Sequence, residues 1–363
     1  MTVQFSAGDP APWFRAASLD GRPDFAFDTA AGRHILLLFA GSAGSEAGQA
    51  ALRMIAARRA LFDDRHACFF GVTCDPDDAA AGRIAKLMPG VRWFLDYDAR
   101  VSRGYGAVGA DGRYRPFWLL LDPALRVIDR AGIAEGVRLF DRLAALAGEP
   151  EDMSIAPVLV VPRIFDPALC RRLIDLYDAH GGKPSGFMRE EEGKTVGTLD
   201  SSFKRRSDFH LDDEPELRAL INARLLRTLV PQIQRAFHFR VSRVERYVVA
   251  CYDGDGKGGF FRAHRDNSTT GTAHRRFACT INLNAEDYEG GELRFPEYGN
   301  RLYRAPTGGA VIFSCSLLHE AMPVTRGRRY AYLPFFYDEA AAQVREANAK
   351  SGKVSEKLAN YRA

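Results

Sequence analysis

Short apolar runs alternate with amphipathic stretches along the first 150 residues of the chain. Four of these runs have the length and the aliphatic or aromatic content of buried strands, namely His34–Ala40, Cys68–Thr73, Trp93–Asp96 and Phe117–Leu121. Three stretches have helical periodicity instead, namely Ser45–Phe62, Asp78–Leu87 and Gly136–Leu146. Strands that alternate with helices predict an α/β sandwich with parallel strands.

The pattern changes in the second half of the chain. Two helical segments, Pro167–His180 and Glu214–Ala236, precede a run of strands from Val241 to Phe336. These strands are rich in aromatic residues and are separated by glycine-rich turns, which is typical of a β-sandwich or jelly roll. The segment 148–157 is rich in Gly, Pro and acidic residues and predicts a boundary. We therefore expect a first domain over residues 1–150, a second over 155–340 and a helical tail over 341–363.

Composition and charge exclude few classes of protein. The chain has 363 residues, of which 46% are hydrophobic and 26% charged, so two sizeable cores can form. Its 50 basic and 46 acidic residues give a net charge of only +4. We therefore expect that the protein binds neither nucleic acid nor a membrane. The one short basic run, Lys204 to Arg206, is interpreted as a solvated turn.

Features that direct a chain to a membrane or an oxidising compartment are missing from the sequence. No apolar stretch approaches the roughly 18 residues that cross a bilayer. The first residues lack a basic segment followed by an apolar one, so no secretory signal is expected. The six cysteines are scattered without a CxxC pair, which indicates reduced thiols. Together these features predict a cytoplasmic protein.

Three residues of the second half form a candidate metal site. His264 and Asp266 stand in an H-x-D arrangement, and alternation along a strand places both side chains on one face. His319 follows a glycine-led apolar strand further along the chain. Two imidazoles and one carboxylate make the facial triad of non-haem Fe(II) enzymes, which leaves open positions on the metal.

The H-x-D pattern by itself is weak, because the chain contains a second copy. His210 and Asp212 have the same spacing and directly precede an acidic segment that opens a helix. Acidic residues suit the positive end of a helix, so this second copy is interpreted as a helix cap.

An arginine supports the assignment of His264 and Asp266 to a metal site. Arg329 follows His319 on what is predicted to be the next strand, where its guanidinium can hold a distal carboxylate in a bidentate pair. Strand alternation sends only one of Arg328 and Arg329 inward, and the Arg-Tyr-Ala context favours Arg329.

Residues 155–338 resemble the prolyl 4-hydroxylase-like group of 2-oxoglutarate/Fe(II) oxygenases. The segments that carry this resemblance, in family order, are APVLVVPRIFDPALCRRLIDLY, ACYDGDGKGGFFRAHRDN, TINLN, EGGELRFPEYG and the HE…PVTRGRRYA ending. The resemblance implies a double-stranded β-helix, which is a distorted jelly roll. It also implies an enzyme that consumes O₂ and 2-oxoglutarate, forms succinate and CO₂, and hydroxylates a C–H bond.

The resemblance assigns roles to particular residues. It implies that His264, Asp266 and His319 bind Fe(II), and that Arg329 binds the C5 carboxylate of 2-oxoglutarate. Tyr252 matches the family tyrosine on the preceding strand, where its hydroxyl faces the cosubstrate or the substrate. Asn282 stands where family members often place a tyrosine that contacts the same carboxylate, and its shorter amide puts this contact in question.

The substrate and any accessory reductant stay open. A prolyl residue is the first candidate among the small molecules and proteins on which the family acts, and ascorbate is a candidate reductant. The alternative to an enzyme is a module that binds iron and 2-oxoglutarate with little turnover. The polar segment 181–209 is either a lid over the substrate or a disordered connection.

Residues 7–135 resemble the peroxiredoxin branch of the thioredoxin fold. The segments that match are GDPAPWFRAASLDGR, RHILLLF, FFGVTCDP and FLDYDARVSRGYGAVG…LLLDPALRVI. Peroxide reduction needs a reactive thiolate at the start of the helix after the first core strand. The loop there contains Ser42 and Ser45, and no cysteine precedes Cys68. We therefore expect a domain without peroxidase activity that serves as a scaffold or binds a protein partner.

Overall fold

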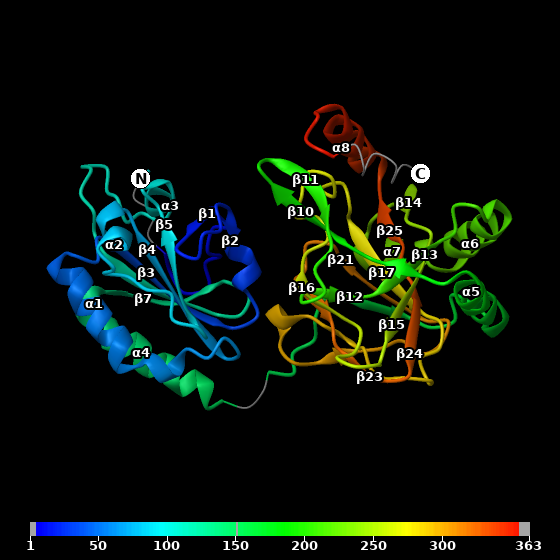
Figure 1. Ribbon diagram of the computed structural model, residues 1–363, viewed down its shortest axis with the longest axis horizontal. Helices are drawn as coiled ribbons and strands as arrows, with labels where there is room; N and C mark the ends of the chain where they lie inside the picture. Colours follow the sequence, from blue (N-terminus) through cyan, green and yellow to red (C-terminus); the bar gives the residue numbers. More distant parts are fainter. Residues whose placement is uncertain (1–4, 150–151, 356–363) are drawn as a thin grey trace. The chain divides into compact units, whose positions relative to one another are not determined.

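The computed structural model describes residues 5–149 and 152–355 (Figure 1). The chain divides into two compact units, which are described separately. The first holds the described residues up to Ser154 together with Pro296–Asn300, and the second holds Ile155–Phe295 and the described residues from Arg301 onward. Part of the expected boundary, residues 150–151, and the end of the expected tail, residues 356–363, lie outside the described residues.

The first unit is built on a seven-stranded sheet with the order β2-β1-β5-β4-β3-β6-β7. The strands are β1 (Arg15–Ser18), β2 (Phe25–Ala26), β3 (His34–Gly41), β4 (Ala67–Thr73), β5 (Val91–Leu95), β6 (Phe117–Leu121) and β7 (Val127–Gly132). The middle strands β4 and β6 are buried at every residue, as their continuous apolar runs predict. The four strands expected from the sequence are therefore confirmed, with ends that shift by one or two residues.

The expectation that all strands are parallel is wrong. Only the pairs β3–β4 and β4–β5 are parallel, whereas β1–β2, β1–β5, β3–β6 and β6–β7 are antiparallel. The reason lies in the connections: β6 and β7 are joined by a turn at 122–126, and such a short link forces an antiparallel pair.

Helices α1 (Glu46–Ala57) and α4 (Gly136–Ala147) cover one face of this sheet (Figure 1). They bury Ile55 and Phe140 among the strand residues of that core. Short helices α2 (Pro76–Ala80) and α3 (Arg100–Gly104) complete the unit. The expected helix over Asp78–Leu87 is wrong, because α2 ends at Ala80 and Gly82 then takes a left-handed backbone with φ +64°.

The second unit contains two larger sheets. One has five strands in the order β12-β16-β22-β19-β20, which are β12 (Lys204–Arg205), β16 (Phe260–His264), β22 (His319–Ala321), β19 (Leu293–Arg294) and β20 (Leu302–Tyr303). The other follows the path β14-β25-β17-β24-β15-β13-β9, with β21 on β17 and β8 on β21. Its strands are β14 (Arg243–Glu245), β25 (Phe335–Tyr337), β17 (Phe277–Asn282), β24 (Arg328–Tyr332), β15 (Val248–Asp253), β13 (Ser207–His210), β9 (Lys183–Pro184), β21 (Ala310–Ser314) and β8 (Leu159–Val161).

Three helices of the second unit pack against one face of the larger sheet. These are α5 (Pro167–His180), α6 (Pro215–Thr228) and α7 (Val230–Phe237), and their apolar residues share a core with Val249, Ile281 and Tyr332. Because side chains alternate along a strand, the residues between these, such as Tyr252, Thr280 and Arg329, lie on the opposite face. The fold thus separates an apolar face under the helices from a polar face that points away from them.

Two further expectations for this unit need correction. The single helix expected over Glu214–Ala236 is two helices, because the first ends before Leu229 and α7 starts at Val230, with Pro231 in its first turn. The disordered connection weighed for residues 181–209 is wrong, since this segment forms strands. Among them is the hairpin of β10 (Phe187–Glu191) and β11 (Lys194–Thr198).

The two remaining strands, β18 (Glu289–Gly290) and β23 (Val324–Arg326), pair with each other. Helix α8 (Glu339–Lys350) begins at Asp338, whose side chain caps it. All six cysteines are free, and all but Cys74 are buried, as expected. Among residues 5–149 and 152–355, every helix is too short or too polar to span a lipid bilayer.

Candidate active site

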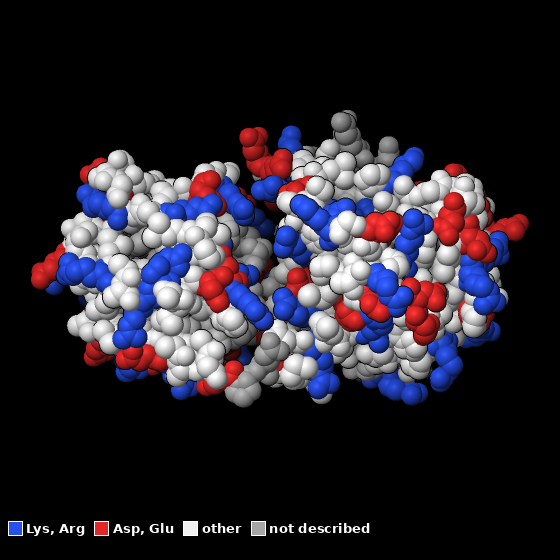
Figure 2. Space-filling model, turned by 60° about the horizontal axis from the view of Figure 1, so that its bottom comes forward, with Lys and Arg blue, Asp and Glu red and all other residues white. Residues whose placement is uncertain are grey.

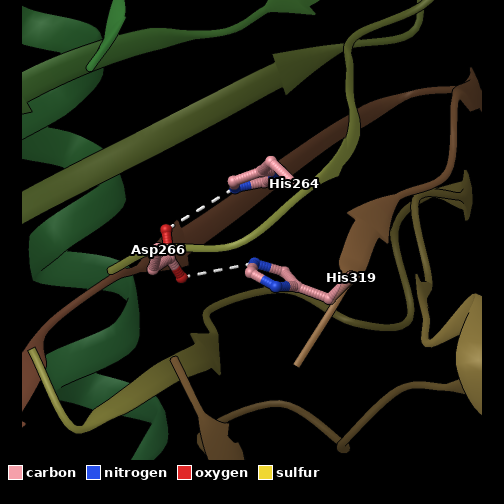
Figure 3. A group of neighbouring side chains, drawn as sticks. All are labelled: His264, Asp266 and His319. Carbon is pink, nitrogen blue, oxygen red and sulfur yellow. Dashed lines mark ion pairs between the residues drawn. The ribbon is translucent and has the colours of Figure 1, made fainter. Parts of the chain in front are cut away.

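Strand pairing brings the three candidate metal ligands together. His264 ends β16 and His319 begins β22, and the two strands pair with His264 opposite His319. Asp266 follows β16 by two residues, and its N–H donates to the carbonyl of Cys315, just before β22 (3.0 Å). Three side chains that are separated in the sequence therefore point at one another (Figure 3).

The ligand atoms of His264, Asp266 and His319 all lie within 4.8 Å of one another. His264 Nε2 is 3.5 Å from Asp266 Oδ1, and His319 Nε2 is 3.3 Å from Asp266 Oδ2. Among the described residues, no other group of three potential ligands meets at one point. One metal ion can therefore be held by two imidazoles and one carboxylate.

Hydrogen bonds fix which nitrogen of each imidazole faces the centre. His264 Nδ1 lies 2.7 Å from the carbonyl of Arg262, and His319 Nδ1 lies 3.0 Å from that of Leu317. A carbonyl can only accept, so each Nδ1 carries the proton and each Nε2 keeps its lone pair for a ligand bond. Support of this kind from the main chain sets ring orientation in metal sites.

Aromatic side chains hold the imidazoles from behind. The ring of Phe261 stacks on that of His264 with centroids 3.6 Å apart, and the ring of Phe313 lies 4.5 Å from that of His319. Since these contacts restrict both rings, little rotational freedom is lost when a metal binds.

Burial and mutual proximity put the ligands in their metal-binding charge states. Burial lowers the pKa of His264 to about 4, with a further contribution from the neighbouring His319. Burial alone raises the pKa of Asp266, but His319 and His264 outweigh it and hold that pKa well below its usual range. At neutral pH, His264 is thus uncharged, with a lone pair available for a metal, and Asp266 is an anion. These are the charge states that binding of a divalent metal requires.

The second H-x-D pair lies elsewhere. His210 is on β13, and neither it nor Asp212 belongs to the ligand group among the described residues. The interpretation of this pair as a cap is wrong, because the residue before α6 is Glu214 and no side chain caps that helix. Pro215 at the first helical position lacks an N–H, which leaves one fewer donor to satisfy.

Arg329 lies on β24 and is 2% exposed, whereas Arg328 is exposed and pairs with Asp253 (3.0 Å). The inward orientation expected for Arg329 is therefore confirmed. Its Nη2 donates to Thr280 Oγ1 (2.9 Å), while its Nε and Nη1 are buried without a protein partner. A buried guanidinium with two unpaired nitrogens leaves charged donors for the oxygens of a carboxylate.

The other two predicted contacts differ in outcome. Tyr252 on β15 is 4% exposed and lines the same cavity as Arg329, whose guanidinium carbon lies 5.0 Å from the centre of the tyrosine ring. Asn282 does not line this cavity, because its Nδ2 donates to the carbonyl of Ala305 (2.6 Å). Thr280, two residues earlier on the same face of β17, takes the position beside Arg329 instead.

The cavity also contains two arginines that the sequence analysis did not assign to the site. It has a volume of about 60 Å³, and its lining includes the three metal-ligand candidates, Arg329 and also Arg206 and Arg246. The interpretation of Lys204 to Arg206 as a solvated turn is wrong, since Lys204 is 6% and Arg206 9% exposed. The spacing of Lys204 and Arg206 was the available signal, because two residues that are two positions apart in extended backbone lie on one face.

Comparison with known proteins finds a family model that matches part of the chain. Residues 247–337 match the model of the 2OG-Fe(II) oxygenase superfamily, and this segment contains His264, Asp266, His319 and Arg329. A PKHD-type hydroxylase of Synechococcus sp. is 31% identical over 122 residues, which is 32% of this chain and 51% of that protein. The PKHD-type hydroxylase PiuC of Pseudomonas aeruginosa is 36% identical over 98 residues, 25% of this chain and 41% of that protein. The chain thus spans about half the length, or less, of these curated relatives.

Two solved structures each resemble part of the chain, with low identity. A prolyl hydroxylase of Trichoplax adhaerens covers 53% of this chain and 86% of its own, at 16% identity and a TM-score of 0.42. AhpC of Mycobacterium tuberculosis covers 40% of this chain and 94% of its own, at 17% identity and a TM-score of 0.34.

Proposed function

We propose that the second unit is a dioxygenase that uses Fe(II), 2-oxoglutarate and O₂ to hydroxylate a C–H bond of its substrate. One observation carries this proposal: the cavity that holds His264, Asp266 and His319 also holds Arg329, whose Nε and Nη1 are buried without a partner. A metal site and an unpaired arginine in one cavity suit a ligand that chelates through one end and carries a carboxylate at the other.

The side chains fit these groups by their chemistry. An Fe(II) ion on two imidazoles and one carboxylate would supply open positions for 2-oxoglutarate and O₂ and the oxidising power for C–H hydroxylation. Arg329 would orient the distal carboxylate of 2-oxoglutarate, and Thr280 holds that guanidinium in place. Tyr252 would form one wall beside the cosubstrate.

Apolar side chains line much of the rest of the cavity, including Phe261, Phe313 and Phe335. Their role in the proposed reaction is to exclude water, which strengthens the charged contacts inside. The two sheets that carry the site, with His264 and His319 on one and Arg329 on the other, are proposed to form a double-stranded β-helix. On the sequence resemblance, a prolyl residue is the first substrate to test.

A spectroscopic experiment tests the metal and cosubstrate assignments together. Fe(II) and 2-oxoglutarate added without oxygen are expected to give a weak visible metal-to-ligand band, and admission of air is expected to yield succinate. The His319→Ala variant should lose both signals by at least about a hundredfold, because a ligand contributes more to binding than the outer contacts that already affect it by 10- to 100-fold. His180→Ala, which removes an exposed imidazole, is the matched control.

The outcomes separate the readings of this site. A band without succinate, in the presence of host extract and with or without ascorbate, would support a sensor of 2-oxoglutarate instead of an enzyme. Products 16 Da heavier than compounds of the extract, found by untargeted mass spectrometry, would identify the substrate. Absence of the band in the wild-type protein would contradict the proposal.

For the first unit, we propose a thioredoxin-like domain without peroxidase activity. Ser45 caps α1 by accepting from the N–H of Gly48 (3.0 Å), and Ser42 Oγ donates to Asp75 Oδ2 (2.6 Å). The N–H of Ala43 donates to the fully buried Asp78 (2.7 Å). These donors at the helix end, which could stabilise a thiolate, are thus bound to side chains of the protein itself.

A further inference from the structure

Three cations line or back one wall of the proposed active-site cavity. This group, called here the cationic wall, consists of Lys204, Arg206 and Arg246. Arg206 and Arg246 line the cavity directly, and Lys204 lies behind, with its Nζ 4.7 Å from the centre of the Phe261 ring. Basic and acidic side chains are interspersed on the face drawn in Figure 2, whereas this wall gathers three basic residues, of which Lys204 and Arg206 are buried and Arg246 is largely buried.

The cationic wall shares a single carboxylate. Arg206 pairs with Asp208 through two bonds of 2.7 Å, and Arg246 Nη2 reaches the same carboxylate at 3.1 Å. Burial raises the pKa of Asp208, but Arg206 and Arg246 outweigh it and hold that pKa below its usual range. Even with Lys204 neutral, two guanidinium groups therefore face one negative charge.

Nearby carboxylates are bound to other groups. Glu245 is held by Arg275 (2.7 Å) and by His274 (2.5 Å). Asp266 belongs to the proposed metal site. Burial of a charge is unfavourable unless it is paired, so the excess positive charge of the wall calls for an anion from outside the protein.

The two arginines differ in how far the protein satisfies them. Arg206 donates to Asp208, to Ser185 Oγ (3.2 Å) and to Tyr252 Oη (3.3 Å), so each of its three nitrogens has a partner. Arg246 has a buried Nε without a partner. Its backbone is also in the left-handed region, with φ +69°, a conformation that non-glycine residues keep where the surrounding structure imposes it. Arg246 is thus held in place with a donor left over.

We propose that the substrate of this oxygenase carries an anionic group, a carboxylate in particular, which binds Arg246 in the field of Arg206. The proposal rests on the proposed function, because the same cavity holds the candidate iron ligands. It differs from the cosubstrate site, since Arg329 has its own unpaired donors for the distal carboxylate of 2-oxoglutarate. Within one cavity, the two free cationic positions thus serve two different anions.

A titration with matched probes tests this assignment. The anaerobic complex with Fe(II) and saturating 2-oxoglutarate is titrated with L-proline and with L-prolinamide. The same complex is then titrated with two capped prolyl peptides, one with aspartate and the other with asparagine beside the proline. The carboxylate member of at least one pair should shift the visible band at a concentration at least tenfold below that of its neutral partner. A shift marks binding beside the cosubstrate, whereas bleaching marks its displacement.

Variants test whether Arg246 causes the preference for carboxylate probes over neutral ones. Arg246→Met should weaken carboxylate binding by about tenfold or more, as expected for one charge-assisted hydrogen bond, with the affinity for 2-oxoglutarate changed less than twofold. Arg246→Lys should restore part of the preference, which a purely structural role would not predict. Arg243→Met removes an exposed arginine that pairs with Glu339, and it is the matched control.

Each remaining outcome overturns the inference. Neutral probes that bind as tightly as the carboxylates would overturn it, and so would a carboxylate preference that survives in Arg246→Met. A wild-type complex that shows its band but responds to no carboxylate would overturn this inference and leave the proposed function standing. A wild-type protein that shows no band would overturn both.

Discussion

The start of α1 in the first unit and the cavity of the second unit both contain buried polar groups, but they satisfy them differently. In the first unit, the N–H of Ala43 and the guanidinium of Arg83 are bound to Asp78 (both 2.7 Å). In the second, Arg329 and Arg246 keep buried nitrogens without partners. The first network is closed by the protein, and the second is left open towards a cavity.

This difference is informative because an unpaired buried donor is unfavourable. Native proteins pair nearly all such groups, so donors that stay unpaired around a cavity indicate a ligand. The network at the start of α1 occupies the N–H groups of Ala43, Gly44 and Gly48, so these donors are not open to a reactive thiolate. The same physical rule thus assigns a structural role to one region and a binding role to the other.

The largest expected effect comes from removing the one carboxylate of the cationic wall. Asp208→Asn leaves Arg206 and Arg246 buried without a counter-charge, which should destabilise the second unit by about 3–5 kcal/mol. Urea unfolding of the full chain measures this, with the transition of the second unit identified by its shift on adding Mn(II). Asp253→Asn, which breaks the exposed pair with Arg328, should cost less than about 1 kcal/mol. Equal effects of the two variants would contradict the role given to Asp208.

A smaller effect is expected from the arginine proposed to hold 2-oxoglutarate. Arg329→Met removes the two unpaired donors and should raise the KM for 2-oxoglutarate by about 10- to 100-fold, the range of a charge-assisted pair. Succinate formation at varied 2-oxoglutarate measures it. Arg328→Met, which changes the exposed neighbour, should stay within about twofold. If the two variants behave alike, the cosubstrate is not bound at this end of the cavity.

No effect at all is expected when the first unit is tested as a peroxidase. Burial raises the pKa of Cys68 to about 12 and also raises that of Cys74, so both thiols stay protonated at neutral pH. Hydrogen peroxide consumption driven by dithiothreitol should match the blank, and Ser42→Cys should not change this while Asp78 occupies the helix end. Consumption above the blank that disappears in Cys74→Ser would show that this thiol is reactive after all.

Local sequence patterns were sufficient for many elements. Helix α5 occupies Pro167–His180 as expected, because Pro167 suits a first helical position and the next residues keep an apolar face. Strand β6 occupies Phe117–Leu121, since a continuous apolar run of that length fits only a buried strand of this sheet. Strand alternation predicted that only one of Arg328 and Arg329 points inward, and the Arg-Tyr-Ala context favoured Arg329, which is the buried one.

Long-range pairing decided what local patterns could not. The pattern of β6 does not distinguish a parallel from an antiparallel neighbour, because both bury the same side chains. Asn282 has the spacing to face the cavity, yet its side-chain amide donates a hydrogen bond to the carbonyl of Ala305, which is distant in the sequence. The basic residues Lys204 and Arg206 indicated a surface turn in the sequence. They are buried because the strands around them, β12 and β13, pair with β16 and β15.

The sequence by itself determined which residue types were available for iron and carboxylate chemistry, and their order along the chain. Only the tertiary structure decided which of them share a cavity, and which polar atoms are left unpaired there. The physical reason is that a side chain's type is a local property, whereas burial and hydrogen-bond partners depend on segments that are distant in sequence. Arg246 shows this most clearly, because nothing in its neighbourhood along the chain reveals the donor that it keeps free.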